Sequence, residues 1–325
     1  MRDSFKRQIE YLRISVTDQC NLRCIYCMPE SGLRPAKESD LLTPSEITRF
    51  VSSARRHGLR KVRLTGGEPL LRGDIVSIVS SIKRAGINDL SMTTNGVFLS
   101  GHASELRKAG LKRVNISLDT LDAGKYRLMT RGGDISRVWE AIEEAERAGL
   151  YPIKINVVPV RGINDGEVEE FASLTFERDY HIRFIELMPS RGNGIIRPKA
   201  RVEKGEFIER VSRLGELTRL PFKGKGPSRN YRLKGAKGII GFISPVSDCF
   251  CAYCNRLRLT SYGKIRPCLF SDEEIDVISP MRKGVSDSEL DGLFLKAAAI
   301  KPPGHHLKGF QPGGTGLPSM SQIGG

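Results

Sequence analysis

The stretch RKAGLKRVNISL, residues 107–118, contains the pattern that decides the fold. It opens with two cations, continues with a glycine and a leucine, and ends in a run that contains β-branched residues. A glycine at this place adopts the left-handed conformation that ends a helix, and cations stabilise a helix C-terminus. The stretch therefore predicts a helix that ends near Gly110 and a strand that follows it.

The same pattern occurs three more times along the chain, at Gly58, Gly86 and Gly149. Strand-like runs alternate with these helix ends: YLRISV, KVRLT, DLSMT, RVNISL, IKINVV and IRFIEL. Six strand–helix units predict an α/β protein with a parallel sheet, most simply a partial (βα)6 TIM-like barrel. Catalytic groups of such barrels lie at the carboxyl ends of the strands, and polar residues and glycines gather there in this sequence.

The alternation weakens after residue 190, where a basic, glycine-rich segment begins. Beyond it come the run GIIGFIS, a second group of cysteines, another apparent hairpin and a tail rich in glycine and proline. We therefore expect two parts, a barrel over residues 1–190 and a C-terminal extension over residues 191–325.

The composition limits the classes of function. The 325 residues carry a formal net charge of +15, which a nucleic acid, a phosphorylated small molecule or a generally basic surface could each explain. No stretch approaches the roughly 18 consecutive apolar residues of a membrane span. The first ten residues are mixed polar and charged, so we expect a cytoplasmic protein with no membrane segment.

Seven cysteines fall into two groups at opposite ends of the sequence. Disulfides are unusual in a cytosolic chain, and clustered cysteines there indicate metal or redox chemistry. Cys20, Cys24 and Cys27 form a C-x₃-C-x₂-C pattern directly after the first strand. Three thiolates can hold a 4Fe–4S cluster and leave one iron open, whereas zinc would want a fourth ligand. The spacing favours the cluster, with zinc as the alternative.

The second group also contains three regularly spaced cysteines, Cys251, Cys254 and Cys268. Cys249 lies two residues before them and supplies a possible fourth ligand. Spacing alone therefore leaves a four-cysteine zinc site and a second cluster equally open.

The first group resembles the signature of the radical S-adenosylmethionine (SAM) superfamily, because an aromatic residue precedes its last cysteine. Gly66-Gly67-Glu68-Pro69, at the end of the second strand, resembles the GGE motif of that superfamily. The resemblance implies a 4Fe–4S cluster whose open iron binds SAM and reduces it to a 5′-deoxyadenosyl radical. The positions that match SAM contacts are Tyr26, Gly67, Glu68, Ser117 and Met188.

The run CNRLRLT at residues 254–260, the later RPCL and the terminal Gly-Gly closely resemble the GTP 3′,8-cyclases, the molybdenum cofactor biosynthesis protein A family. The resemblance extends from Tyr11 to Gly325. It implies a second 4Fe–4S cluster on Cys251, Cys254 and Cys268 that binds guanine, with Cys249 outside the pattern. The residues that would bind GTP are Arg13, Arg63, Thr94, Lys154, Arg183, Arg256, Leu257 and Arg258, of which Arg183 is our own addition.

The same resemblance implies the reaction. The adenosyl radical takes the hydrogen from C3′ of GTP, the sugar radical attacks C8 of guanine, and reduction gives (8S)-3′,8-cyclo-7,8-dihydroguanosine 5′-triphosphate on the route to the molybdenum cofactor. Gly324 and Gly325 take part in catalysis in that family. The expected partners are a flavodoxin-like or similar electron donor, a downstream pyranopterin-forming enzyme and a second copy of the chain.

Two other interpretations remain. The first is a different radical SAM enzyme with an auxiliary cluster, such as a peptide-modifying maturase, against which the Asn255–Arg258 run and the terminal glycines count. The second is a basic, zinc-bearing nucleic-acid-binding protein. Aromatic residues make up only 7% of the chain, so stacking platforms are scarce. We therefore expect no nucleic-acid partner.

Overall fold

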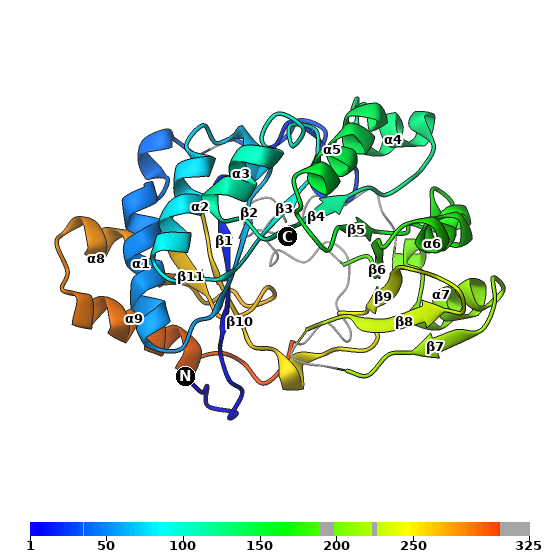
Figure 1. Ribbon diagram of the computed structural model, residues 1–325. Coiled ribbons are helices and arrows are strands. Elements are labelled where there is room, and N and C mark those ends of the chain that lie inside the picture. The colour runs from blue at the N-terminus through cyan, green and yellow to red at the C-terminus, as the bar shows by residue number, and fades with distance from the viewer. Residues whose placement is uncertain (35, 189–197, 223–225, 306–325) are drawn as a thin grey trace.

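One curved sheet organises the computed structural model, which describes residues 1–34, 36–188, 198–222 and 226–305 (Figure 1). Its strand order is β12-β11-β10-β1-β2-β3-β4-β5-β6-β9-β8-β7. The strands are β1 (Tyr11–Ser15), β2 (Lys61–Thr65), β3 (Asp89–Thr94), β4 (Arg113–Ser117), β5 (Lys154–Val157), β6 (His181–Ile185), β7 (Leu217–Arg219), β8 (Arg229–Leu233), β9 (Ile239–Ile243), β10 (Arg256–Leu259), β11 (Lys264–Arg266) and β12 (Ile275–Asp276).

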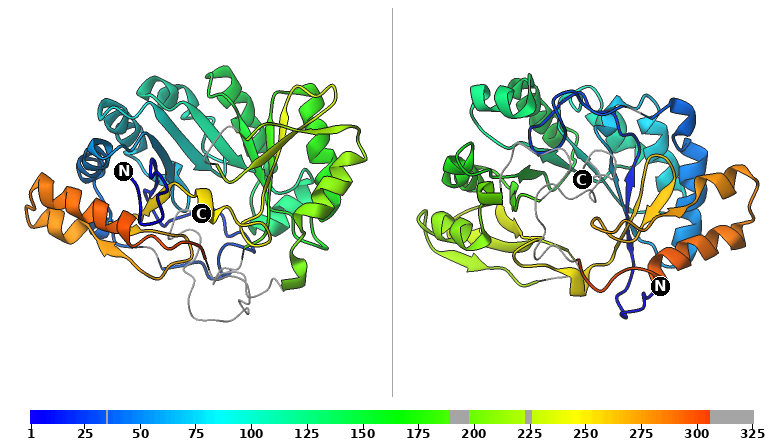
Figure 2. Two further views of the ribbon diagram at one scale, coloured as in Figure 1. Left: turned by 90° about the horizontal axis from the view of Figure 1, so that it is seen from below. Right: turned by 180° about the vertical axis from the view of Figure 1, so that it is seen from behind.

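Helices cover the outer, convex face of this sheet (Figures 1 and 2). They are α1 (Pro44–Arg56), α2 (Ile75–Arg84), α3 (Ala103–Ala109), α4 (Ala123–Thr130), α5 (Ile135–Arg147), α6 (Val168–Glu177), α7 (Lys204–Ser212), α8 (Ile278–Arg282) and α9 (Asp287–Ala299). The strands β1 to β6 pair in parallel and in sequence order, which confirms the predicted partial barrel.

The C-terminal part of the chain continues the same sheet at both of its edges. Strand β9 pairs in parallel with β6, and β10 pairs in parallel with β1, so eight neighbouring strands run parallel. Antiparallel strands follow on each side, β8 and β7 beyond β9, and β11 and β12 beyond β10. The connection over residues 244–255 joins the two edges of the open barrel and carries three of the second-group cysteines.

Helix ends follow the signals in the sequence. The backbone N–H groups of Thr43 and Glu46 are capped reciprocally at the start of α1, at 2.8 and 3.2 Å. All four predicted terminal glycines have positive φ, and Gly110 is the C-cap of α3. Helix α9 was not predicted, although Ser286 and Glu289 form a second capping box at its start.

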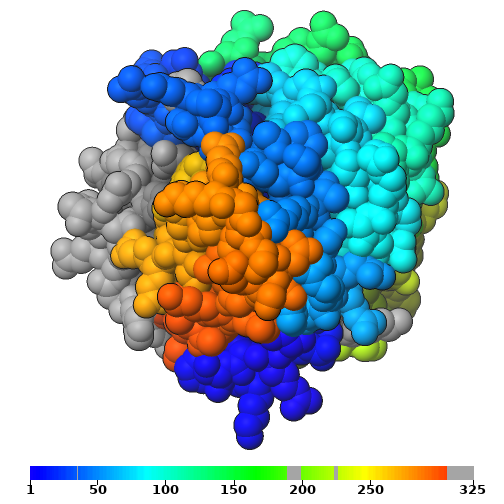
Figure 3. All heavy atoms as spheres, turned by 90° about the vertical axis from the view of Figure 1, so that its left-hand side faces the viewer, coloured from blue at the N-terminus to red at the C-terminus, as the bar shows by residue number. Residues whose placement is uncertain are grey.

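Helix α9 packs against α1. Figure 3 shows the orange residues of α8 and α9 beside the blue residues of α1 on the surface. Asp291 of α9 accepts hydrogen bonds from Ser53 at 2.5 Å and Arg56 at 2.6 Å, both on α1. These contacts attach α9 to the first helix of the barrel. Among the described residues, every helix is too short or too polar to span a lipid bilayer.

The alternation of side chains along each strand separates the core from the inner face of the barrel. Leu12, Ile14, Val62 and Leu64 are fully buried between the sheet and the helices. The residues that alternate with them face inward, because successive side chains of a strand point to opposite sides. On β10, β1 and β2 the inward positions are Arg256, Arg258, Tyr11, Arg13, Lys61 and Arg63.

Candidate active site

A cavity of about 1110 Å³ occupies the inner face of the barrel. Residues from all eight parallel strands line it, and so do six of the seven cysteines, all except Cys249. A volume of this size exceeds that of a typical single-ligand pocket, about 300–1,000 Å³. The cavity therefore has room for two nucleotide-sized ligands beside each other.

The first cysteine group lies where the chain leaves β1. The backbone N–H of Cys27 donates to the carbonyl of Cys24 at 2.9 Å, and the amide Nδ2 of Asn95 lies 3.8 Å from Cys20 Sγ. Burial raises the pKa of Cys20 to about 11 and the pKa of Cys24 well above its ordinary value. Three thiols on one wall of the cavity fit three corners of an iron–sulfur cluster, whose positive irons stabilise the thiolates.

The GGEP motif forms the end of β2 and approaches this group closely. A Cβ atom on Gly67 would lie 2.1 Å from the carbonyl oxygen of Gln19, so only glycine fits at this position. Gly66 and Gly67 line the cavity.

Glu68 lies behind the cavity wall. Its carboxylate is fully buried and accepts hydrogen bonds from Thr94 Oγ1 at 2.7 Å, Asn95 N at 2.7 Å and Leu70 N at 3.1 Å. Burial raises the pKa of Glu68 to about 7 in spite of these three donors. In this structure the carboxylate connects the ends of β2 and β3, and it does not line the cavity.

The other positions expected to bind SAM do line the cavity, namely Tyr26, Ser117 and Met188. The hydroxyl of Tyr26 donates to Asp119 Oδ2 at 2.6 Å, and the backbone N–H of Val158 donates to Asp119 Oδ1 at 2.8 Å. Burial raises the pKa of Asp119 to about 6. Asp119, which is not among the positions expected to bind SAM, therefore fixes the orientation of the tyrosine ring.

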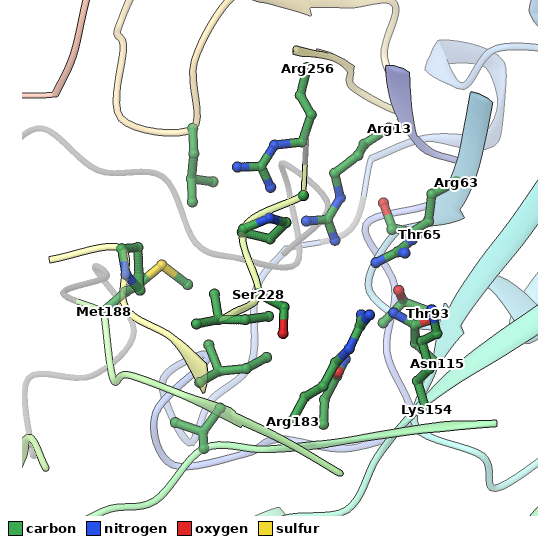
Figure 4. Close-up of a pocket in the computed structure, with 18 of the residues that line it drawn as sticks. Arg13, Arg63, Thr65, Thr93, Asn115, Lys154, Arg183, Met188, Ser228 and Arg256 are labelled. Atoms are coloured by element: carbon green, nitrogen blue, oxygen red, sulfur yellow. The ribbon is translucent and has the colours of Figure 1, made fainter. Parts of the chain in front are cut away.

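A ring of cationic side chains, most of them partly buried, lines another part of the cavity. The strand register places Arg13 of β1 opposite Arg63 of β2 and Arg258 of β10. Figure 4 shows the guanidinium groups of Arg13, Arg63, Arg183 and Arg256 pointing into the same space from different strands. Six of the eight residues expected to bind GTP are cations, and the structure brings them together: Arg13, Arg63, Lys154, Arg183, Arg256 and Arg258.

Burial and mutual repulsion lower the pKa values of several of these cations. Burial, with repulsion from Arg183 and other cations, lowers the pKa of Lys154 to about 6. Burial and repulsion from Arg63 lower the pKa of Arg183 to about 9. A cavity lined by this many positive groups favours a polyanionic ligand, because a nearby negative charge stabilises their protonated forms. Lys61 and Arg232 add two further cations that the sequence analysis missed.

The second cysteine group lines the cavity beside these arginines. Burial alone would raise the pKa of the Cys254 thiol, but the charges of Arg256 and Lys301 outweigh it and lower that pKa to about 6. The three thiols Cys251, Cys254 and Cys268 therefore fit a metal cluster as well as the first group does.

Two of the residues expected to bind GTP use their side chains within the protein itself. The side chain of Leu257 is 1% exposed and belongs to the core, on the face of β10 opposite to its two arginine neighbours. Thr94 lines the cavity, but its hydroxyl donates to Glu68 and accepts from the backbone N–H of Gly96 at 3.0 Å. Gly324 and Gly325 lie outside the described residues.

Neutral polar residues complete the wall, and none of them is among the residues expected to bind SAM or GTP. Asn115, fully buried on β4, has no hydrogen-bond partner for either side-chain amide atom among the described residues. The same holds, within the described ranges, for Tyr11 Oη, Thr93 Oγ1 and Asn156 Oδ1. Tyr11, Asn115 and Asn156 each lie two residues from an expected site residue on the same strand, so the alternation of side chains along a strand could have indicated them. Thr93 directly precedes Thr94, and this alternation gives no signal for it.

Comparisons with known proteins identify the family of the chain. Residues 14–175 match the radical SAM superfamily model, and residues 180–307 match the model described as Molybdenum Cofactor Synthesis C. A protein named GTP 3′,8-cyclase from Moorella thermoacetica is 48% identical over the full length of both chains. Its namesakes from Thermodesulfovibrio yellowstonii and Heliobacterium modesticaldum are 47% and 49% identical, again over both full lengths.

A solved structure supports the fold alone. The Streptococcus suis protein SuiB bound to S-adenosylmethionine superimposes with a TM-score of 0.60 at 15% identity, over 83% of this chain and 63% of that chain. The identity of the full-length relatives is far above this level. The chain therefore belongs to the GTP 3′,8-cyclase family of radical SAM enzymes.

Proposed function

We propose that this cavity holds SAM and GTP together, each beside its own 4Fe–4S cluster, and performs the GTP 3′,8-cyclase reaction of its family. The product is (8S)-3′,8-cyclo-7,8-dihydroguanosine 5′-triphosphate, in the first step of molybdenum cofactor biosynthesis. One observation carries the proposal: a single cavity is lined by two groups of three cysteines and by a ring of cationic side chains.

Cys20, Cys24 and Cys27 would hold the first cluster, and Cys251, Cys254 and Cys268 the second. When bound, the first cluster supplies the electron that cleaves SAM, and the second binds the guanine ring. The chain's own contribution near the first cluster is positional. Gly67 allows the backbone to approach SAM closely, and Asp119 holds the Tyr26 ring through the 2.6 Å hydrogen bond.

The cation ring would bind the triphosphate, which carries about four negative charges near neutral pH. Arginine forks match phosphate oxygens, and Arg13, Arg63, Arg256 and Arg258 supply them from three adjacent strands. Lys154 would take up a proton when the triphosphate arrives, because a nearby anion favours the charged form. This positioning holds the ribose in a fixed place relative to SAM.

The neutral residues Thr93, Asn115 and Asn156 would hydrogen-bond the sugar and base. Thr93 and Asn115 are register partners on β3 and β4, and Asn115 is paired in turn with Lys154 on β5. A buried amide without a partner is destabilising, so a ligand that satisfies it gains specificity. The buried wall also keeps water from a reactive radical.

Several parts of the proposal rest on the family resemblance. These are the catalytic role of Gly324 and Gly325, the flavodoxin-like electron donor, the downstream pyranopterin-forming enzyme, the homodimer and the cytoplasmic location. The division of the chain at residue 190 also stays a prediction.

The test is anaerobic reconstitution with iron and sulfide, followed by reaction with SAM, GTP and a reductant. We expect about eight irons per chain, because each cubane holds four. We also expect one 5′-deoxyadenosine for each molecule of an isomer of GTP, detected by mass spectrometry. Cys20→Ser should abolish 5′-deoxyadenosine formation. Cys268→Ser should retain about four irons and yield no cyclised nucleotide. A fully active wild-type protein with only four irons per chain would contradict the proposed second cluster.

A further inference from the structure

Three potential metal ligands converge at the rim of the cavity, and one of them lies outside the cluster pattern. The ligand atoms of Cys249, Cys251 and His305 all lie within 4.8 Å of one another. Cys249 and Cys251 belong to the connection between β9 and β10, and His305 follows α9. Residues more than 50 positions apart in the sequence therefore supply one compact donor set.

One nitrogen of the His305 imidazole belongs to this donor set. Its Nε2 lies 2.6 Å from the carbonyl oxygen of Pro245, which can only accept, so Nε2 carries the proton. Nδ1 then carries the lone pair that a metal requires. Histidines that bind metals usually donate their other ring nitrogen to a carbonyl or carboxylate in this way. The ring also packs edge-on against Phe270, with centroids 4.9 Å apart.

Arg7 holds the two halves of this donor set together. Its Nη1 donates to the carbonyl of Cys251 at 2.9 Å and to the carbonyl of Pro303 at 3.1 Å. A buried ion pair with Asp3, at 2.6 Å, fixes the guanidinium. A Cβ atom added to Gly304 would lie 3.8 Å from Cys251 Cβ, so the segment before His305 lies close to this cysteine. These contacts position Cys251 and the segment before His305 without a metal.

The spacing suits one ion better than it suits a cluster. Zinc lies about 2.3 Å from thiolate sulfur and about 2.0–2.1 Å from imidazole nitrogen, so tetrahedral ligands are about 3.5–4 Å apart. The corners of a cubane hold their cysteines further apart than this. Cys254 and Cys268 do not belong to the compact set.

We propose that Cys249, Cys251 and His305 bind a single zinc ion when the second cluster is absent. Two thiols would each lose a proton to form two Zn–S bonds, Nδ1 of His305 would be the third ligand, and water would complete the tetrahedron. Because Cys251 is also a ligand of the proposed second cluster, zinc and that cluster exclude each other; this consequence rests on the proposed function.

Cobalt is the probe for the site itself, because Co²⁺ in a tetrahedral thiolate site absorbs visible light. The titration uses the cluster-free full chain with Cys20, Cys24 and Cys27 replaced by Ser, so that the first group cannot bind the ion. We expect one equivalent of Co²⁺ with Co–thiolate absorption, displaced by one equivalent of Zn²⁺. Adding Cys249→Ser or His305→Gln should weaken binding at least tenfold, whereas Cys268→Ser should leave it unchanged.

The result that would overturn the proposal is the reverse order, with Cys268→Ser abolishing binding and Cys249→Ser preserving it. Absence of any Co–thiolate band in a chain with unchanged far-ultraviolet circular dichroism would also overturn it. Both outcomes leave the proposed cyclase function intact, because neither measurement involves a cluster.

A second measurement tests the exclusion in the chain with all seven cysteines. Zinc added before reconstitution should reduce the iron content from about eight to about four per chain. Cys249→Ser should keep about eight irons with or without zinc. Eight irons in zinc-treated wild type would contradict the exclusion, whereas four irons without zinc would contradict the second cluster. A loss of four irons in Cys249→Ser without zinc would make Cys249 a cluster ligand and refute our assignment.

Discussion

The hydroxyl of Thr94 donates a 2.7 Å hydrogen bond to the buried carboxylate of Glu68. The same hydroxyl accepts from the backbone N–H of Gly96, so both of its hydrogen-bonding directions are used inside the protein. Asn95, the next residue, donates its backbone N–H to Glu68, and its side-chain nitrogen lies 3.8 Å from Cys20 Sγ. The bonds of Thr94 and Asn95 to Glu68 therefore fix the end of β3, and Asn95 connects it to the first cysteine group.

The neighbouring threonines give a matched test of this role. Thr94→Val removes a donor to a buried carboxylate, and we expect it to lower the free energy of unfolding by about 1–3 kcal/mol. Thr93→Val removes a hydroxyl that has no partner in the described part of the chain, and it should change that free energy by less than about 0.5 kcal/mol. Urea denaturation of the cluster-free chains checks both values. Equal destabilisation by the two variants would contradict the assignment.

Gly67→Ala should prevent the first cluster from assembling. The new Cβ would lie 2.1 Å from the Gln19 carbonyl, so the segment that carries Cys20 must move. We expect iron to fall to about four per chain after reconstitution, with no cleavage of SAM. Gly73→Ala is the control, because its Cβ meets nothing within 4 Å. Normal iron content in Gly67→Ala would show that the cysteine loop adjusts freely.

The affinity for GTP should depend on pH through Lys154. Its pKa in the free protein is about 6, because burial and Arg183 favour the neutral amine. A bound triphosphate favours the charged form and raises this pKa, so binding above pH 6 takes up a proton. The affinity should therefore fall as the pH rises from 6 to 8.

Lys154→Arg isolates this contribution, because arginine stays charged throughout that range. The γ-phosphate of GTP titrates in the same range, so the informative quantity is the difference between the two proteins. Calorimetry in buffers of different ionisation enthalpy should show greater proton uptake by wild type than by Lys154→Arg at pH 8. Identical uptake by both would place the proton elsewhere.

Asn115→Leu should separate stability from ligand binding. The amide is fully buried without a partner in the described ranges, so an apolar group of similar volume should leave the free energy of unfolding unchanged or raise it. The same change should weaken binding of GTP or SAM at least tenfold, since the ligand would lose its hydrogen bonds. Binding by isothermal titration and urea denaturation check the two halves. A destabilised variant with normal binding would make Asn115 a structural residue.

The sequence by itself determined the elements that depend on neighbours along the chain. The helix ends at Gly58, Gly86, Gly110 and Gly149, the capping box at Thr43 and the six alternating strands all follow from local backbone and hydrogen-bonding preferences. The cysteine spacing indicated two metal or cluster sites, and the family resemblance supplied the arginines that line the cavity.

Only the tertiary structure decided what depends on residues distant in sequence. The pairing of β9 with β6 and of β10 with β1 brought the second cysteine group into the barrel, and no local signal specifies such long-range register. Packing also placed Leu257 in the core and Glu68 behind the wall. The proximity of His305 to Cys249 likewise results from contacts across the fold, because burial and charge balance act in space and leave no period in the sequence.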